Sequence, residues 1–373
     1  MAEGKRITEL DIMKGMGIIL IAVYHLVYRS MDGIADNMIR GMGWAYIGIF
    51  FLLSGYTFSR QDSVMQSYKK KVLGLLLPAL MLELVLLTLG GIYCIFVHDY
   101  TFQDILHDAA VTVLRPEITT RISAEWGNGG VLFLNLSPVW FIWGMLWTEL
   151  FFFPLRKLLD GKGEVIWCAA MLLLMGIQIP LYICMEPAPW GLTLVPTYLQ
   201  FMLIGAKLRE KNAVEMLKKI RPLPAFGLTV VCLAVHFGLF LFNGNENYYA
   251  GLIGRRGALD VFTVILQVLP AALAFFLIAR AIGKVAWLHT GLEWLGRHTL
   301  GILMMHCLLG MVFCDMLGTY IKPGPNWYLE LHNIPLTTEI ILKSVLSCVL
   351  ALAASVLLQL LWGKGKRARK GKK

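Results

Sequence analysis

Residues 72–97 read VLGLLLPALMLELVLLTLGGIYCIFV, with Glu83 as the one charged side chain in the run. An α-helix needs about 20 residues to cross the roughly 30 Å of bilayer hydrocarbon, and this run exceeds that length. It lacks the alternation of apolar and polar residues that marks a membrane β-strand. The stretch therefore predicts a helix that spans a membrane.

Comparable apolar runs recur on both sides of this stretch. The ten predicted spans are residues 12–28, 41–58, 72–97, 138–155, 164–185, 190–207, 223–243, 259–281, 297–318 and 338–361. The chain of 373 residues is 57% hydrophobic and 16% charged, against about 25% charged in an ordinary soluble domain, which excludes a water-soluble globule. Lipid admits only helices and closed barrels, and these runs are not barrel strands. We predict an all-α, polytopic integral membrane protein with about ten transmembrane helices.

The distribution of positive charge predicts the orientation, because Lys and Arg accumulate in cytoplasmic loops. With ten spans, most of the 34 Lys and Arg residues fall on the face that holds both termini. Both termini are therefore expected in the cytoplasm, in a multi-pass protein of the plasma membrane. The basic tail 363–373 could bind nucleic acid or anionic lipid, or act only as a topology signal. No nucleic-acid module accompanies it, so we expect membrane lipid and no nucleic acid as a partner.

The chain is expected to form a single membrane domain over residues 1–373. Its longest loop is the external stretch 98–137, which leaves no room for a separate soluble domain. The internal stretch 285–295 has the spacing of an amphipathic helix lying on the membrane interface. The seven cysteines form no C-x-x-C pair and fall mainly inside spans, so we predict neither a disulfide framework nor a metal site.

Three ionisable residues in the first span are candidates for function. Asp11, Lys14 and His25 share one helix face at about 100° per residue, and His25 lies roughly 16 Å further along the axis than Lys14. Ionisable groups inside a membrane are costly unless they are paired or face a wet cavity. A long donor with phosphates at one end and a reactive group at the other, such as a coenzyme A thioester, fits a cation and an imidazole so placed. Alternatively, His25 bonds a neighbouring helix and Lys14 reaches the headgroups.

Four motifs together resemble the acyltransferase-3 family of membrane O-acyltransferases. They are Arg-x4-Asp-x2-Lys-Gly-x9-His at 6–25, GIFFLLSGY at 48–56, PVWFI at 138–142 and LGRHTLGILMMH at 295–306. The resemblance extends in order over the whole chain. Many members carry Arg where this sequence has Lys14, and a Tyr before the late His where it has Met304 or Met305.

The resemblance implies transfer of an acyl group, usually acetyl, from cytoplasmic acetyl-CoA to a hydroxyl of a cell-envelope or lipid-linked carbohydrate. The essential His of the family maps onto His25, and the basic residue before it maps onto Lys14. Acyl-CoA is then a donor substrate, and no permanently bound cofactor is expected. The acceptor, the acyl chain, the oligomeric state and the role of His25 as base or acyl carrier stay open.

Other candidates extend this expected site. His306 and Asp11 join His25 as candidate catalytic residues, His306 orienting His25 or the acceptor, or simply bonding another helix. Ser54 and Arg60 join Lys14 as candidate donor-binding residues, although Arg60 and the lysines of 69–71 are also ordinary positive-inside charges, and Ser54 also suits close helix packing. The candidate substrate-binding residues are Trp140 and Glu149, the latter alternatively a residue of the membrane interface.

Two other functional classes remain compatible with this composition. A transporter or flippase for a lipid-linked sugar or anionic metabolite would use the intramembrane His, Lys and Glu as a pathway. Against it, no paired Gly/Pro-broken spans stand in corresponding halves of the chain. A sensing or assembly subunit would leave the Asp11, Lys14 and His25 face unexplained.

Overall fold

The computed structural model describes residues 6–27, 33–59, 61–97, 100–106, 110, 139–184, 189–242, 258–317 and 338–370. Within these ranges every regular element is helical. The elements are α1 (Thr8–Val27), α2 (Gly33–Thr57), α3 (Val64–Lys71), the π-helix η2 (Val72–Leu76), α4 (Leu77–Val97), α8 (Val139–Leu158), α9 (Glu164–Cys184), the 3-10 helix η3 (Pro189–Leu194), α10 (Val195–Glu210), α11 (Ala213–Lys218), α12 (Pro222–Phe242), α13 (Ala258–Ile282), α14 (Ala286–Arg297), α15 (Thr299–Met316) and α17 (Thr338–Lys370).

Each of the ten predicted spans coincides with a helix, which confirms the all-α class. In the described part of the chain, the helices long and apolar enough to cross a membrane are Val64–Val97, Glu164–Leu181, Pro222–Phe242 and Phe262–Ile282. Shorter apolar helices are Ala45–Thr57, Thr299–Gly310 and Val345–Leu360. The protein is thus helical with membrane character, whereas ten crossings and cytoplasmic termini stay predictions. Most of the external loop 98–137 lies outside the described residues.

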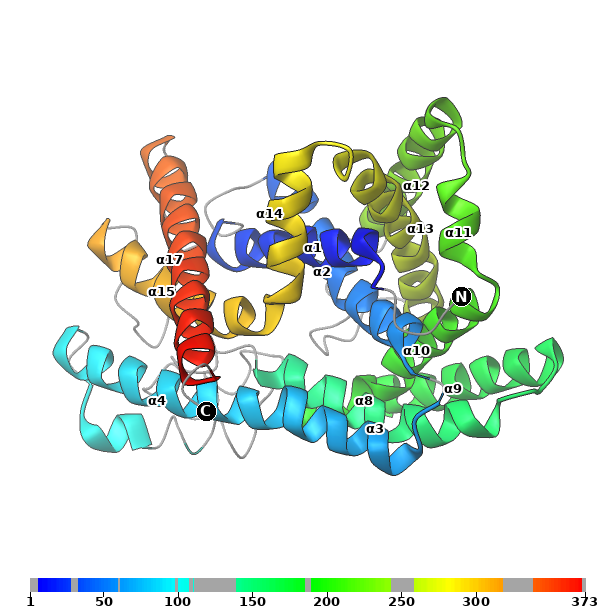
Figure 1. Ribbon diagram of the computed structural model, residues 1–373, viewed down its shortest axis with the longest axis horizontal. Coiled ribbons are helices and arrows are strands. Elements are labelled where there is room, and N and C mark those ends of the chain that lie inside the picture. The colour runs from blue at the N-terminus through cyan, green and yellow to red at the C-terminus, as the bar shows by residue number, and fades with distance from the viewer. Residues whose placement is uncertain are drawn as a thin grey trace.

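The helices α1 and α2 lie near the centre of the molecule (Figure 1). α1 packs against α2, α13, α14, α15 and α17, and α2 packs against α10 and α13. Their contact surfaces are rich in large buried side chains, and the rings of Phe51 on α2 and Tyr198 on α10 stack with centroids 3.9 Å apart. By contrast, α4, α9 and α12 bury few of their residues and present apolar side chains outward. The molecule therefore has a closely packed centre. Around it lies an apolar periphery, formed by the outward-facing side chains of α4, α9 and α12.

Glycines allow two pairs of helices to touch backbone to backbone. Where α2 crosses α10, a Cβ on Gly55 would overlap the carbonyl oxygen of Met202, and one on Gly205 would overlap that of Leu52. Small residues let apolar helices approach closely, which membrane interfaces use in place of the hydrophobic effect. The Gly in the Ser54-Gly55 motif is thus required by packing.

The crossing of α1 and α14 is built in the same way. A Cβ on Gly15 would overlap the carbonyl oxygen of Leu292, and one on Gly296 would overlap that of Asp11. The stretch 285–295 is helical and packs across α1 (Figure 1), and its position on the membrane interface stays a prediction. This contact holds α14 against the end of α1 that carries Asp11 and Lys14.

Candidate active site

The structure brings His25 of α1 and His306 of α15 into direct contact. His25 Nδ1 lies 2.8 Å from His306 Nε2, and the two rings stack with centroids 5.1 Å apart and planes 25° apart. His306 is fully buried, and His25 is partly buried. The two residues are 281 positions apart in the chain, so the contact between α1 and α15 creates the pair.

Hydrogen bonding assigns the protonation of this pair. His306 Nδ1 lies 3.0 Å from the carbonyl oxygen of Ile302, to which only an N–H can donate. A neutral His306 then accepts at Nε2, and His25 donates to it from Nδ1. His25 Nε2 therefore carries a lone pair, the arrangement that a general base needs.

Cys307 adds a thiol to the pair, and our sequence reasoning missed it. Its Sγ lies 3.3 Å from His306 Nε2, and the ligand atoms of His25, His306 and Cys307 all lie within 4.8 Å of one another. Two imidazole nitrogens and a thiolate are ligand types that zinc uses, at about 2.0–2.1 Å from each nitrogen. The two nitrogens here stand at hydrogen-bond distance from each other, so we interpret the cluster as a hydrogen-bonded group, and the absence of a metal site stays a prediction.

A cluster of positive charge surrounds Asp11 near the start of α1. The buried Asp11 carboxylate accepts from Arg6 and lies 3.9 Å from both Lys14 Nζ and Arg297 Nε. The hydrogen bond that Arg6 donates to Asp11 raises the pKa of the Arg6 guanidinium. Arg297, at the last turn of α14, also pairs with Glu293. Three cations face the carboxylates of Asp11 and Glu293, which leaves an excess of positive charge suited to an anionic group.

A second polar network lies beside this cluster. Glu149 of α8 is 1% exposed, and its Oε1 accepts from Ser54 Oγ at 2.9 Å and from Lys71 Nζ. The charge of Lys71 also repels that of Lys14, so the two networks are neighbours. Glu149 is therefore buried inside the protein and bound by two partners. Lys71 forms an ion pair with Glu149, so it has a structural contact in addition to its contribution to the positive charge of the loop.

A double-mutant cycle tests the Lys71 and Glu149 pair. We expect Lys71→Met to lower the free energy of unfolding more than the double variant Lys71→Met with Glu149→Gln, because the single change leaves a buried carboxylate without its cation. The expected coupling is about 1–3 kcal/mol. Unfolding of the four proteins in the same detergent measures it, and additive effects would show that the pair carries no mutual stabilisation.

The remaining predicted residues are placed as follows. Asp11 lies about 14 residues along α1 from His25, roughly 21 Å by helix rise, so it is a partner of cations rather than of the imidazoles. Ser54 and Glu149 come together with Lys71, away from the histidine pair. Trp140 falls within α8, but its side chain, like the whole of Arg60, lies outside the described residues.

Comparison with known proteins adds one finding to this geometry. The acyltransferase-3 family model, described as an acyltransferase domain, matches residues 7–360, nearly the whole chain. Neither the search of curated proteins nor the search of solved structures found a match. The matched region includes both histidines, the Ser54, Lys71 and Glu149 network, and the cation cluster apart from Arg6. The chain therefore belongs to the acyltransferase-3 family and is a membrane acyltransferase.

Proposed function

We propose that the protein moves an acetyl group from acetyl-CoA, on the face predicted to be cytoplasmic, to a hydroxyl of a cell-envelope or lipid-linked carbohydrate on the other face. The observation that carries this proposal is that α1 presents a cation cluster at one end and the hydrogen-bonded His25 and His306 pair toward the other. Lys14 and His25 are separated by roughly 16 Å along the helix. An extended thioester with its phosphates at Lys14 directs its carbonyl toward His25.

The histidine pair supplies the proton transfers of this reaction. His25 Nε2 takes the proton of the acceptor hydroxyl while the hydroxyl oxygen forms a bond to the thioester carbonyl carbon. The tetrahedral intermediate then breaks its C–S bond, and the imidazolium returns the proton to the departing thiolate. His306 accepts from His25 Nδ1–H throughout and is a positioning residue, fixed in turn by the Ile302 carbonyl.

Lys14, Arg6, Arg297 and Lys71 bind the donor phosphates in this proposal. Lys14 is a point charge that lacks the bidentate geometry of Arg. The side chain of Asp11 keeps three of these cations at one place, which is its role here instead of a direct catalytic one. The family match leaves the transporter interpretation without support.

The direct experiment follows label from acetyl-labelled CoA with purified protein in liposomes, with and without cell-envelope extract. We expect label to appear on envelope glycan and to be released as acetate by mild alkali. A folded protein that leaves the label on CoA in every extract would overturn the proposal.

Lys14→Ala is expected to raise KM for acetyl-CoA about tenfold and to change kcat little, because it removes a contact to the donor that is the same in the ground and transition states. Lys343→Ala is the matched control. Lys343 pairs with Glu339 on α17, which contributes no cation to the proposed donor site. A fall in kcat at unchanged KM for Lys14→Ala would contradict a role in donor binding.

A further inference from the structure

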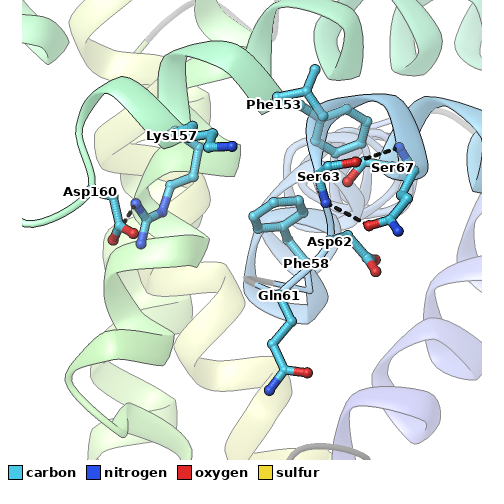
Figure 2. Close-up of a pocket in the computed structure, with 11 residues that line it drawn as sticks. Phe58, Gln61, Asp62, Ser63, Ser67, Phe153, Lys157 and Asp160 are labelled. Atoms are coloured by element: carbon cyan, nitrogen blue, oxygen red, sulfur yellow. Dashed lines mark hydrogen bonds and ion pairs between the residues drawn. The ribbon is translucent and has the colours of Figure 1, made fainter.

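A pocket of about 240 Å³ lies where the end of α2, the start of α3 and the end of α8 meet. Its lining residues include Phe58 from the α2 end, Ser67 from α3, and Phe153, Arg156 and Lys157 from α8 (Figure 2). None of these residues belongs to the site described above. The pocket lies on the side of the molecule that the charge distribution predicts to be cytoplasmic.

The pocket continues the Ser54, Lys71 and Glu149 network by one helical turn. Phe58 follows Ser54 by four residues, Phe153 follows Glu149 by four, and Ser67 precedes Lys71 by four. Four residues advance a helix by about 6 Å. On each of the three segments, the pocket residue therefore lies about 6 Å along the axis from the residue that belongs to the network. A molecule bound at the cations of Lys14 and Lys71 therefore has this pocket as its neighbour.

The walls of the pocket combine an aromatic surface with buried polar atoms. The rings of Phe58 and Phe153 lie with centroids 5.4 Å apart and planes 23° apart. Ser67 Oγ and Arg156 Nε are buried and have no hydrogen-bond partner within the described part of the chain. Buried polar atoms are nearly always hydrogen-bonded in native proteins, so two such atoms in residues of one pocket wall favour a polar ligand over an apolar one.

The charges of the pocket favour a nucleotide over a cation. Of its two carboxylates, Asp62 is bound by Lys70 and Asp160 is bound by Arg156. Arg156 also pairs with Glu210, and its Cζ lies 5.3 Å from the ring centroid of Trp167. These contacts hold the Arg156 side chain in one position in the pocket wall. Lys157 is exposed at the rim and adds a mobile positive charge.

We infer that this pocket receives the nucleotide end of the acyl-CoA donor, with the purine against the partly exposed ring of Phe58, which the buried Phe153 backs, its polar edge toward Ser67, and the ribose phosphate at Lys157. This inference rests on the proposed function. It extends the donor site beyond Lys14. The nucleotide of CoA then lies on one side of the cation cluster, and the thioester lies on the other side, toward His25. Recognition of the nucleotide then contributes affinity far from the reacting carbonyl.

The test compares two donors, acetyl-CoA and acetyl-pantetheine, which lacks the nucleotide. We expect Ser67→Ala and Lys157→Ala each to raise KM for acetyl-CoA about fivefold, the range for one lost hydrogen bond or charge contact, and to leave KM for acetyl-pantetheine unchanged. Lys162→Ala is the matched control, since Lys162 is an exposed lysine in the connection that follows α8 and does not line the pocket. Equal effects on both donors, or no effect on either, would overturn the inference.

Direct binding separates this inference from the proposed function. Titration calorimetry with CoA and with pantetheine measures affinity without any acceptor. A protein that binds CoA and transfers no acetyl group contradicts the proposed function, while the Lys157→Ala affinity still decides the pocket. A protein that binds neither compound overturns both.

Stability without ligand gives a second readout for Ser67. Because its hydroxyl has no partner within the described structure, Ser67→Ala should leave the melting temperature of the ligand-free protein unchanged or raise it. The same variant should reduce the upward shift of the melting temperature that CoA produces in the wild type. A structural role for Ser67 would give the reverse, with a lower melting temperature and an undiminished shift.

Discussion

His25→Ala is expected to lower the rate of acetyl transfer about 10²- to 10⁴-fold, the contribution of a positioned general base. KM for acetyl-CoA should change little, because the donor phosphates lie roughly 16 Å away at Lys14. Single-turnover transfer with labelled donor measures the effect, and an unchanged elution profile and melting temperature show that the variant is folded. Undiminished transfer would remove His25 from the mechanism.

Variants of His306 separate positioning from proton transfer. His306→Ala removes the acceptor of the His25 Nδ1–H bond and should lower kcat at unchanged KM, whereas His306→Gln retains an acceptor oxygen and should recover part of the loss. Incubation of each protein with labelled donor and no acceptor tests the acyl-carrier role of His25. Label retained on the protein and lost in His25→Ala would replace the base mechanism with a covalent one.

Gly296→Ala is expected to be strongly destabilising although it adds only one methyl group. The new methyl group would overlap the backbone carbonyl of Asp11, and neither helix backbone can yield without separating α14 from α1. The expected loss is about 3 kcal/mol of unfolding free energy, the upper part of the range for overpacking, with little folded protein recovered. Thermal unfolding and size-exclusion profiles in detergent measure it.

Gly291→Ala provides the control on the same helix. A Cβ at Gly291 meets no atom within 4 Å, so the substitution should leave stability unchanged or raise it by up to about 1 kcal/mol through helix propensity. If the two variants behaved alike, the close approach of α1 and α14 would not be what holds this part of the fold together.

The sequence predicted the helices well because each is a local pattern of apolar residues, readable without knowing its neighbours. It also placed Lys14 and His25 on one face of one helix, since the helical repeat alone determines that. It could not predict contacts in which an element's partner decides its packing. The stretch 285–295 is amphipathic, and the Gly15 and Gly296 contact sets it across α1, which the local pattern alone does not show.

The site residues that were missed depend on contacts distant in sequence. Cys307 follows His306 directly, yet nothing in the sequence states that its thiol shares an acceptor with His25. Arg297 looks like an ordinary charge at a helix end until α14 is packed beside Asp11. Lys71 and Glu149 were both considered from the sequence, but their pairing joins positions 78 residues apart and is visible only in the folded structure. Such groups become a site only through tertiary structure.

The apolar periphery described above has a consequence for how this sequence can diverge. Residues of α4 and α12 such as Leu84 and Phe226 are largely exposed to the surroundings of the molecule, where Leu, Ile, Val and Phe serve almost equally. The contact surfaces of α1, α2, α10 and α14 admit few replacements, because a single methyl group can prevent them from closing. Amino-acid substitutions should therefore accumulate in α4 and α12, mostly as replacements of one apolar residue by another. Two chains with this fold could differ at most positions of those helices and still carry out the same reaction.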